Sequence, residues 1–288
     1  MQNNDIDKKI ISRKKRGEIS KEDLANYKNL STLELINLLK DKEPQKRTIA
    51  ATLLKNQNSD DNKLAIESLS HQFKKEKALY TRLAISNSLT TYTEEAIPYL
   101  IDLLGKIGNN QERALPKKYF NKKSFPLPRD LAARTLAKMG DLPTHYLIDV
   151  IDDNFDVYTD FVKEQALDVI GAIAYKNNDY GAFESINNFY TKTIISENIS
   201  EESRKILLWK IVRSLSGFKN NENALKIVID ILKKSKEVDE IQWESLRTIG
   251  FIKIANDEVL AILNSFKDNE NPNIIMALKN AKNSLEIE

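Results

Sequence analysis

The sequence predicts an all-α fold, a right-handed α-α superhelix of about seven helix pairs, from three observations. The 288 residues include only 8 glycines and 7 prolines, so residues that break helices are scarce. A helical stripe of small and aliphatic residues recurs at steps of about 32 to 47 residues. A second amphipathic segment precedes each stripe. Because one helix pair cannot cover its own apolar face, we expect the pairs to stack into a solenoid.

The stripe begins at a polar residue and continues with small or aliphatic residues three, four and seven positions later. Arg47 is followed in this way by Ala50, Ala51 and Leu54, which share one face of a helix. The same register starts again at Arg82, Arg129, Lys163 and Arg204, and, less closely, at Gln242 and Ile274. Each of these stripes is expected to form the second helix of a pair.

The first helices are expected at the amphipathic segments 33–40, 65–74, 96–107, 146–151, 183–193, 224–233 and 259–266. Pro44 and Pro272 stand where the first turn of a helix tolerates proline. Ser200, followed by Glu201 and Ser203, is a typical helix start.

Two stretches carry a resemblance to a known repeat family. They are residues 47–54, Arg-Thr-Ile-Ala-Ala-Thr-Leu-Leu, and residues 128–141, which begin Pro-Arg-Asp-Leu-Ala-Ala-Arg. Both resemble the HEAT-repeat superfamily, in particular the short bacterial and archaeal HEAT-like repeats related to phycobilisome-lyase repeats. The resemblance extends over roughly residues 31–285 and implies an armadillo-like α-solenoid. It implies little about activity, because one fold hosts many functions.

The segment 1–30 precedes the solenoid expected at 31–288. It concentrates six basic residues within nine positions, namely Lys8, Lys9, Arg13, Lys14, Lys15 and Arg16. Such a cluster is typical of an arm that binds nucleic acid or an acidic partner. The alternative is a charged helix that caps the array, since a terminal repeat needs a polar outer face. Glu18, Glu22 and Asp23 dilute the positive charge and favour the capping interpretation.

The composition excludes several classes of site. There is no cysteine, and the two histidines, His71 and His145, are far apart, so no thiol-ligated metal site or nucleophilic triad is expected. We therefore expect no catalytic residue, cofactor or metal. No apolar run reaches about 18 residues, and the start of the chain lacks the apolar core of a signal peptide. The expectation is a cytoplasmic protein without a membrane partner.

One repeat is interrupted by an insertion at 109–128. Its three prolines prevent a continuous helix, and its basic and aromatic residues alternate. The candidate partner-binding residues here are Lys117, Lys118, Tyr119, Phe120, Lys122, Lys123 and Phe125. Loops that depart from a repeat often carry the function of a solenoid. Alternatively, the aromatic rings pin the loop to its own solenoid, and the basic residues pair with carboxylates of the next repeat. Those carboxylates are Asp149, Asp152, Asp153, Asp156 and Asp160.

The second helices are expected to line the inner face. The residue five positions into each stripe is polar except at Trp209, so this column is expected to face solvent. On this face the candidate partner-binding residues are Arg134, Lys138, Trp209, Arg213 and Arg247. Tryptophan and arginine dominate binding hot spots. The alternative is that Trp209 and Trp243 fill space between helices.

These features predict a non-catalytic interaction scaffold with a protein partner and no small-molecule substrate. The alternative is a nucleic-acid-binding protein, although a net charge of +2 indicates no attraction over the whole surface. Some HEAT-like solenoids are alkylpurine DNA glycosylases that use tryptophan, arginine and one aspartate. Asp168, between Arg134 and Trp209 in the same column, matches that aspartate in residue type only.

Overall fold

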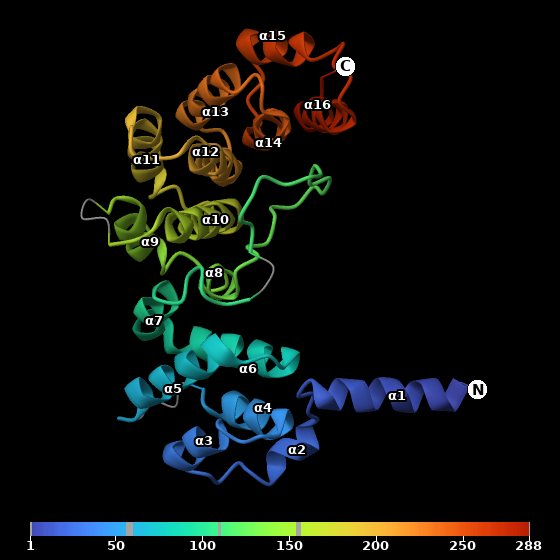
Figure 1. Ribbon diagram of the computed structural model, residues 1–288, viewed down its shortest axis with the longest axis vertical. Coiled ribbons are helices and arrows are strands. Elements are labelled where there is room, and N and C mark those ends of the chain that lie inside the picture. Colours follow the sequence, from blue (N-terminus) through green and yellow to red (C-terminus); the bar gives the residue numbers. More distant parts are fainter. Residues whose placement is uncertain (1, 56–59, 109–110, 154–156, 288) are drawn as a thin grey trace. The chain divides into compact units, whose positions relative to one another are not determined.

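The computed structural model describes residues 2–55, 60–108, 111–153 and 157–287. The chain forms two compact units, Met1–Gly108 and Asn109–Glu288. Within the described ranges all regular structure is helical, and successive helix pairs pack on one another in each unit (Figure 1). The predicted all-α solenoid is confirmed. Two residues of the predicted insertion, Asn109 and Asn110, lie outside the described residues.

Unit 1 carries the first helices of the chain. They are α1 (Gln2–Lys15), α2 (Lys21–Ala25), α3 (Thr32–Leu38), α4 (Pro44–Leu53), α5 (Asn62–Lys75), α6 (Leu79–Leu89), the 3-10 helix η1 (Thr90–Ala96) and α7 (Ile97–Ile101). The two stripe helices α4 and α6 pack against each other, and α3 and α5 pack against them. The small residues Ala50 and Ala51 are fully buried where the stripe helices meet.

Unit 2 carries the remaining pairs. Its helices are α8 (Leu131–Leu136), α9 (Thr144–Ile151), α10 (Asp160–Asn177), α11 (Phe183–Ile195), α12 (Glu201–Leu215), α13 (Glu222–Lys234), α14 (Asp239–Ile252), α15 (Asp257–Ser265) and α16 (Pro272–Leu285). The stripe helices form one continuous row in which α10 packs on α12, α12 on α14 and α14 on α16. The third predicted pair is divided, because its first helix lies in unit 1 and its second in unit 2.

The predicted helix starts are confirmed by the caps. Pro44 and Pro272 each stand at the first turn of a helix, α4 and α16. The Ser200 side chain accepts a hydrogen bond from the Ser203 N–H and so caps α12. A capping side chain satisfies an N–H group that has no partner inside the helix. The start positions are therefore fixed locally, before any packing between pairs.

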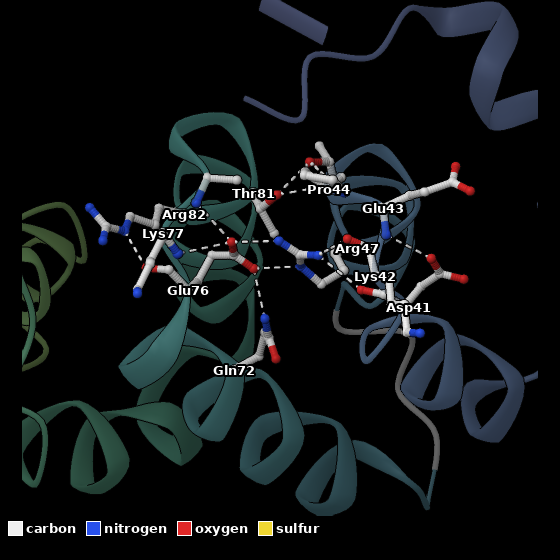
Figure 2. A network of polar contacts seen from close by, with 12 residues as sticks. Asp41, Lys42, Glu43, Pro44, Arg47, Gln72, Glu76, Lys77, Thr81 and Arg82 are labelled. Carbon is white, nitrogen blue, oxygen red and sulfur yellow. Dashed lines mark hydrogen bonds and ion pairs between the residues drawn. The ribbon is translucent and has the colours of Figure 1, made fainter. Parts of the chain in front are cut away.

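The first residue of the stripe ties its helix to the turn before it. Arg47 donates to the backbone carbonyls of Asp41 and Lys42, each at 2.9 Å. It also holds Glu76 with two hydrogen bonds, of 2.8 and 2.9 Å (Figure 2). A two-pronged pair of this kind fixes orientation as well as charge. The first residue of the stripe makes a similar contact in later repeats. Arg204 donates to the carbonyl of Ser196 at 2.6 Å, and Gln242 donates to the carbonyl of Lys236.

Glu76 is the acidic centre of this network in unit 1. Gln72 and the N–H groups of Lys77 and Ala78 also donate to its carboxylate. Although burial favours the neutral acid, Arg47 and these donors lower the pKa of Glu76 to about 2. The carboxylate therefore stabilises unit 1 above its ordinary pKa of 4.5, and that stabilisation is lost as the pH falls towards 2.

The basic segment near the start of the chain packs on unit 1. Helix α1 contacts α4, and the Arg16 carbonyl accepts a hydrogen bond from the Tyr80 N–H at 3.0 Å. Gln45 donates to the carbonyl of Glu18 at 3.2 Å. Lys14 and Lys15 are exposed, and the side chain of Lys9 lies outside the described part. The domain boundary at residue 30 and a role for these cations in binding stay predictions.

Candidate binding site

The inserted loop lies against the stripe helices of its own unit (Figure 1). Its base is fastened by Glu112, which pairs with Arg129 at the far end of the loop at 3.1 Å. Glu112 also pairs with Lys210 at 2.9 Å and with Arg213 at 2.8 Å, both on α12. One carboxylate thus closes the loop on itself and attaches it to the helix row.

Glu112 belongs to a buried cluster of charges between α10 and α12. Lys210 is fully buried and also donates to Asp168, which lies 3.6 Å from Arg213. Although burial favours the neutral acid, Lys210 and Arg213 lower the pKa of Glu112 to about 2. Burial opposes the charge of Arg213, but Asp168 and Glu112 outweigh it and raise the pKa of that guanidinium. The cluster holds its charges because each faces an opposite one.

The middle of the loop is packed into the helix row by Phe125. Its ring reaches Gly171 on α10, where an added Cβ would lie 2.6 Å from the phenyl Cζ. The ring centroid of Phe125 is also 5.8 Å from that of Tyr175. On the other side, the Ser124 carbonyl accepts a hydrogen bond of 2.9 Å from Arg247 on α14. Aromatic packing and a buried guanidinium thus fix the loop at this point.

The tip of the loop is held by α16. Asn273 accepts a hydrogen bond from the Tyr119 N–H at 3.2 Å. Asn280 donates to the Tyr119 hydroxyl at 3.2 Å and to the Asn121 side chain at 2.8 Å. The Phe120 ring lies 5.3 Å from the guanidinium carbon of Arg247. Tyr119 and Phe120 therefore contact helices of the same unit, as in the alternative in which the aromatic residues hold the loop on its own solenoid.

The expectation that the inner column faces solvent is wrong at Asp168, Trp209 and Arg247, although Lys279 in the same column is exposed. Trp209 is 0% exposed, Arg213 5% and Arg247 2%. The Arg213 guanidinium lies 3.9 Å from the Trp209 ring centroid, and Arg247 pairs with Glu244 at 3.0 Å. Asp168 and Arg247 are polar members of the column that form buried ion pairs. Trp209, Arg213 and Arg247 are not on an open groove.

Asp168 is also buried, at 1% exposure, and its charge is balanced by Lys210 and Arg213.

The other predicted residues lie nearer the surface. Lys138 is exposed after α8, and the half-buried Arg134 donates to the Pro128 carbonyl at 3.0 Å. All four loop lysines, Lys117, Lys118, Lys122 and Lys123, are exposed. In the acidic turn, Asp153 pairs with Lys163 at 3.6 Å and Asp152 accepts a hydrogen bond from Ser185 at 2.7 Å. Asp156 lies outside the described residues.

A cavity of about 530 Å³ remains between the loop tip and the ends of the stripe helices. We call it the loop cavity. Its basic lining residues come from the loop, the turn after α12 and the end of α14, and they are Lys122, Lys123, Lys219, Arg247 and Lys253. Tyr119, Tyr175 and Phe251 supply aromatic surface, and α16 supplies Asn280, Asn283 and Ser284. Glu286, which follows α16, is the one acid among these lining residues. The insertion thus creates the site.

The four lysines of the loop cavity have no acidic partner. Within the described residues, no carboxylate lies within 4 Å of Lys122, Lys123, Lys219 or Lys253. Lys219 instead lies 5.2 Å from the Tyr175 ring centroid. The only arginine in the lining, Arg247, is already neutralised by Glu244. The cavity is therefore suited to an anionic ligand.

Sequence reasoning identified Tyr119, Lys122, Lys123 and Arg247 but missed Lys219 and Lys253. These two lysines follow the ends of α12 and α14, outside the seven-residue stripe that defines the repeat. It also missed Glu112 as an anchor. A lysine just after the end of two successive stripe helices, α12 and α14, is the signal that could have identified these lysines.

No protein-family model matches the chain, and no curated protein matches it. Among solved structures, the chain is similar to two engineered proteins, at 13% and 16% identity with TM-scores of 0.41 and 0.34. These alignments cover 88% and 89% of this chain and 96% and 99% of the other. It is also similar to a designed armadillo repeat protein in complex with a (KR)4 peptide, at 14% identity and a TM-score of 0.33. That alignment covers 89% of this chain and 100% of the other. No conclusion about function follows from likenesses at these scores.

In the described ranges, no helix combines the length and apolar character needed to cross a bilayer.

The buried cluster has one further carboxyl whose titration can be measured. Glu164 is buried on α10, and its Oε2 atom has no hydrogen-bond partner. Burial raises the pKa of Glu164 to about 7, with Asp168 and Asp160 adding to the effect and Lys210 opposing it. Between pH 4.5, the ordinary pKa of a glutamate, and about pH 7, Glu164 is therefore protonated more in the folded protein than in the unfolded chain. The free energy of unfolding falls over that interval, by up to about 3 kcal/mol.

Replacing this carboxyl should remove the effect. We expect Glu164→Gln to be more stable than the parent at pH 8, by about 1 to 3 kcal/mol, and similar to it at pH 4.5. Urea unfolding at both pH values measures the difference. Glu197→Gln, in an exposed turn, is the control and should change stability at neither pH. If Glu164→Gln and Glu197→Gln had the same free energy of unfolding at pH 8, ionisation of Glu164 would not destabilise the folded protein, and the account of its pKa would be wrong.

Proposed function

We propose that the protein is a non-catalytic interaction scaffold that holds a segment of another protein in the loop cavity. The observation that carries this proposal is a cavity of about 530 Å³ whose four lysines have no carboxylate partner among the described residues. Unbalanced charge beside a built cavity is typical of a binding site rather than of a packed core. We also propose that the helix pairs that support the site are HEAT repeats.

The rigidity of the cavity supports a role in binding. The loop is fastened at its base by Glu112, in its middle by Phe125 and at its tip by Asn280. A site whose walls are ordered before binding loses less conformational entropy when a partner docks. The exposed Lys117 and Lys118 stand on the same loop outside the lining.

Site-specific crosslinking tests the proposal. A photo-reactive benzoylphenylalanine replaces Asn283, which is exposed and lines the cavity. Irradiation in an extract of the cell that makes the protein should give a discrete, protease-sensitive adduct. The same residue placed at Asn264, exposed on α15, is the control and should give none. No adduct at 283, or the same adducts at both positions, would refute the proposed site.

The same experiment decides the alternative function. An adduct at 283 that nuclease removes and protease does not would show nucleic acid in the cavity. Binding dominated by phosphate should then fall steeply as salt increases. That outcome would replace the protein partner with a nucleic acid at the same site.

A further inference from the structure

The chemistry of the loop cavity specifies what kind of segment fits it. We propose that the occupant is an extended acidic segment of a protein, a run of aspartate and glutamate side chains. The inference rests on the proposed function, since it names the ligand of the same site. It follows from the number of cations, their placement, and the state of the aromatic rings around them.

The charges of the cavity are numerous and separated. Lys122 and Lys123 come from the loop, Lys219 from the turn after α12, and Lys253 from the end of α14. Glu286 is the one acidic residue in the lining. Lysine is a compact point charge, so four of them on three elements match several separate anions better than one. A run of carboxylates along a peptide supplies such anions.

A single phosphate group is a poorer match. Phosphate is recognised most often by arginine, whose planar fork donates two parallel hydrogen bonds. The one arginine in the lining, Arg247, already donates to Glu244 at 3.0 Å and to the Ser124 carbonyl at 2.9 Å. Its guanidinium also lies 4.3 Å from the Phe251 ring centroid. Because Arg247 is engaged within the chain, the lysines are the groups left for a ligand.

A nucleic-acid strand is also a poorer match, because the aromatic faces are occupied. Binding of single strands depends on bases that stack on free rings. The Tyr175 ring centroid lies 5.8 Å from those of Phe125 and of Phe251, and Lys219 lies 5.2 Å from its centre. The Phe251 ring is in turn in contact with the Arg247 guanidinium. The rings therefore pack the walls of the cavity and orient its cations.

The neutral part of the lining suits a peptide backbone. Asn283 and Ser284 are exposed on α16 beside the lysines, and both can donate and accept hydrogen bonds. An extended peptide offers an N–H and a carbonyl at each residue that its neighbours do not satisfy. The volume, about 530 Å³, lies in the range of sites that enclose a small ligand. It holds a few residues of a chain, not a folded domain.

The test is a titration of the full chain with labelled probes, read by fluorescence anisotropy in low salt. The probe is an eight-residue peptide of alternating aspartate and glutamate. Its controls are the corresponding asparagine and glutamine peptide, a phosphoserine peptide of equal net charge, and an oligothymidylate of eight nucleotides. We expect the acidic peptide to bind most tightly and the neutral peptide to bind at least about tenfold more weakly.

Two double variants locate the binding on the loop. Lys122→Glu with Lys123→Glu reverses two charges in the lining and should weaken the acidic peptide about tenfold or more. Lys117→Glu with Lys118→Glu makes the same change of charge on the same loop outside the lining, and should weaken it less than about threefold. All four lysines are exposed, and a thermal melt of each variant checks that folding is preserved.

Several results would overturn the inference. They are the absence of binding by the acidic peptide, tighter binding of the oligothymidylate or the phosphoserine peptide, and equal losses in the two double variants. A protein crosslinked at position 283 together with no affinity for the acidic peptide would leave the proposed function standing and refute only the acidic ligand.

Discussion

Lys210→Met should destabilise unit 2 by about 3 to 5 kcal/mol. Lys210 is fully buried, and its Nζ atom donates to Glu112 at 2.9 Å and to Asp168. Without this cation, Asp168 retains only Arg213, at 3.6 Å, in a site that excludes water. A buried charge left without its partner costs far more than the pair contributes. Both tryptophans, Trp209 and Trp243, lie buried in unit 2, so their fluorescence during urea unfolding reports on this unit.

Two further variants separate this cause from a general effect of losing a lysine. Lys205→Met, on the same helix, removes a surface pair with Glu201 at 3.7 Å and should cost less than about 1 kcal/mol. Adding Asp168→Asn to Lys210→Met removes the orphaned carboxylate and should recover part of the lost stability. A loss for Lys210→Met no larger than for Lys205→Met would contradict the buried cluster.

Gly171→Ala should both destabilise unit 2 and loosen the loop. A Cβ at this position would lie 2.6 Å from Phe125 Cζ, 2.7 Å from Ser214 Cα and 2.9 Å from the Ser214 carbonyl oxygen. The phenyl ring can move, but the Ser214 backbone cannot move without shifting α12 away from α10. Overpacking of this kind costs about 1 to 3 kcal/mol or more. Tryptophan fluorescence measures the stability, and trypsin cleavage after Lys122 and Lys123 measures the exposure of the loop.

Gly181→Ala is the matched control for this substitution. Its Cβ would lie 3.2 Å from the Asp179 side chain and 4.0 Å from that of Thr144, and both are side-chain atoms rather than backbone. We expect a small change in stability and the same rate of loop cleavage as in the parent. If Gly171→Ala behaved like this control, α10 and α12 would not approach as closely as the structure indicates. Faster trypsin cleavage confined to Gly171→Ala would link loop order to the helix contact.

The repeat could be predicted from the sequence because its signals are local. Ala50 and Ala51, Pro44 and Ser200 act within one or two turns of their own helices, and the helices begin where these residues predict. The site of the insertion was also predictable, because it interrupts the period. The helix that each of these residues belongs to could therefore be predicted without knowing the position of any other part of the chain.

The packing of the insertion could not be predicted in the same way. Glu112 meets Lys210 and Arg213, 98 and 101 positions away in the sequence. A polar residue in the inner column looks the same in the sequence whether it faces water or a buried ion pair. Asp168 and Arg247 were assigned to an open groove for this reason. Only the three-dimensional contacts distinguish the two environments.

The central claim is that the inserted loop lies on its own helix row and forms a cavity with it. The chain has no cysteine, so two introduced cysteines would be its only thiols. Asn121 and Asn280 are joined by a hydrogen bond of 2.8 Å across the cavity rim. Asn121→Cys with Asn280→Cys should be joined within one chain by a short bifunctional thiol crosslinker. Asn121→Cys with Asn264→Cys, whose second cysteine is on α15, should not. A failure of the 121–280 pair to crosslink in the folded monomer would contradict the packed loop, and with it the cavity.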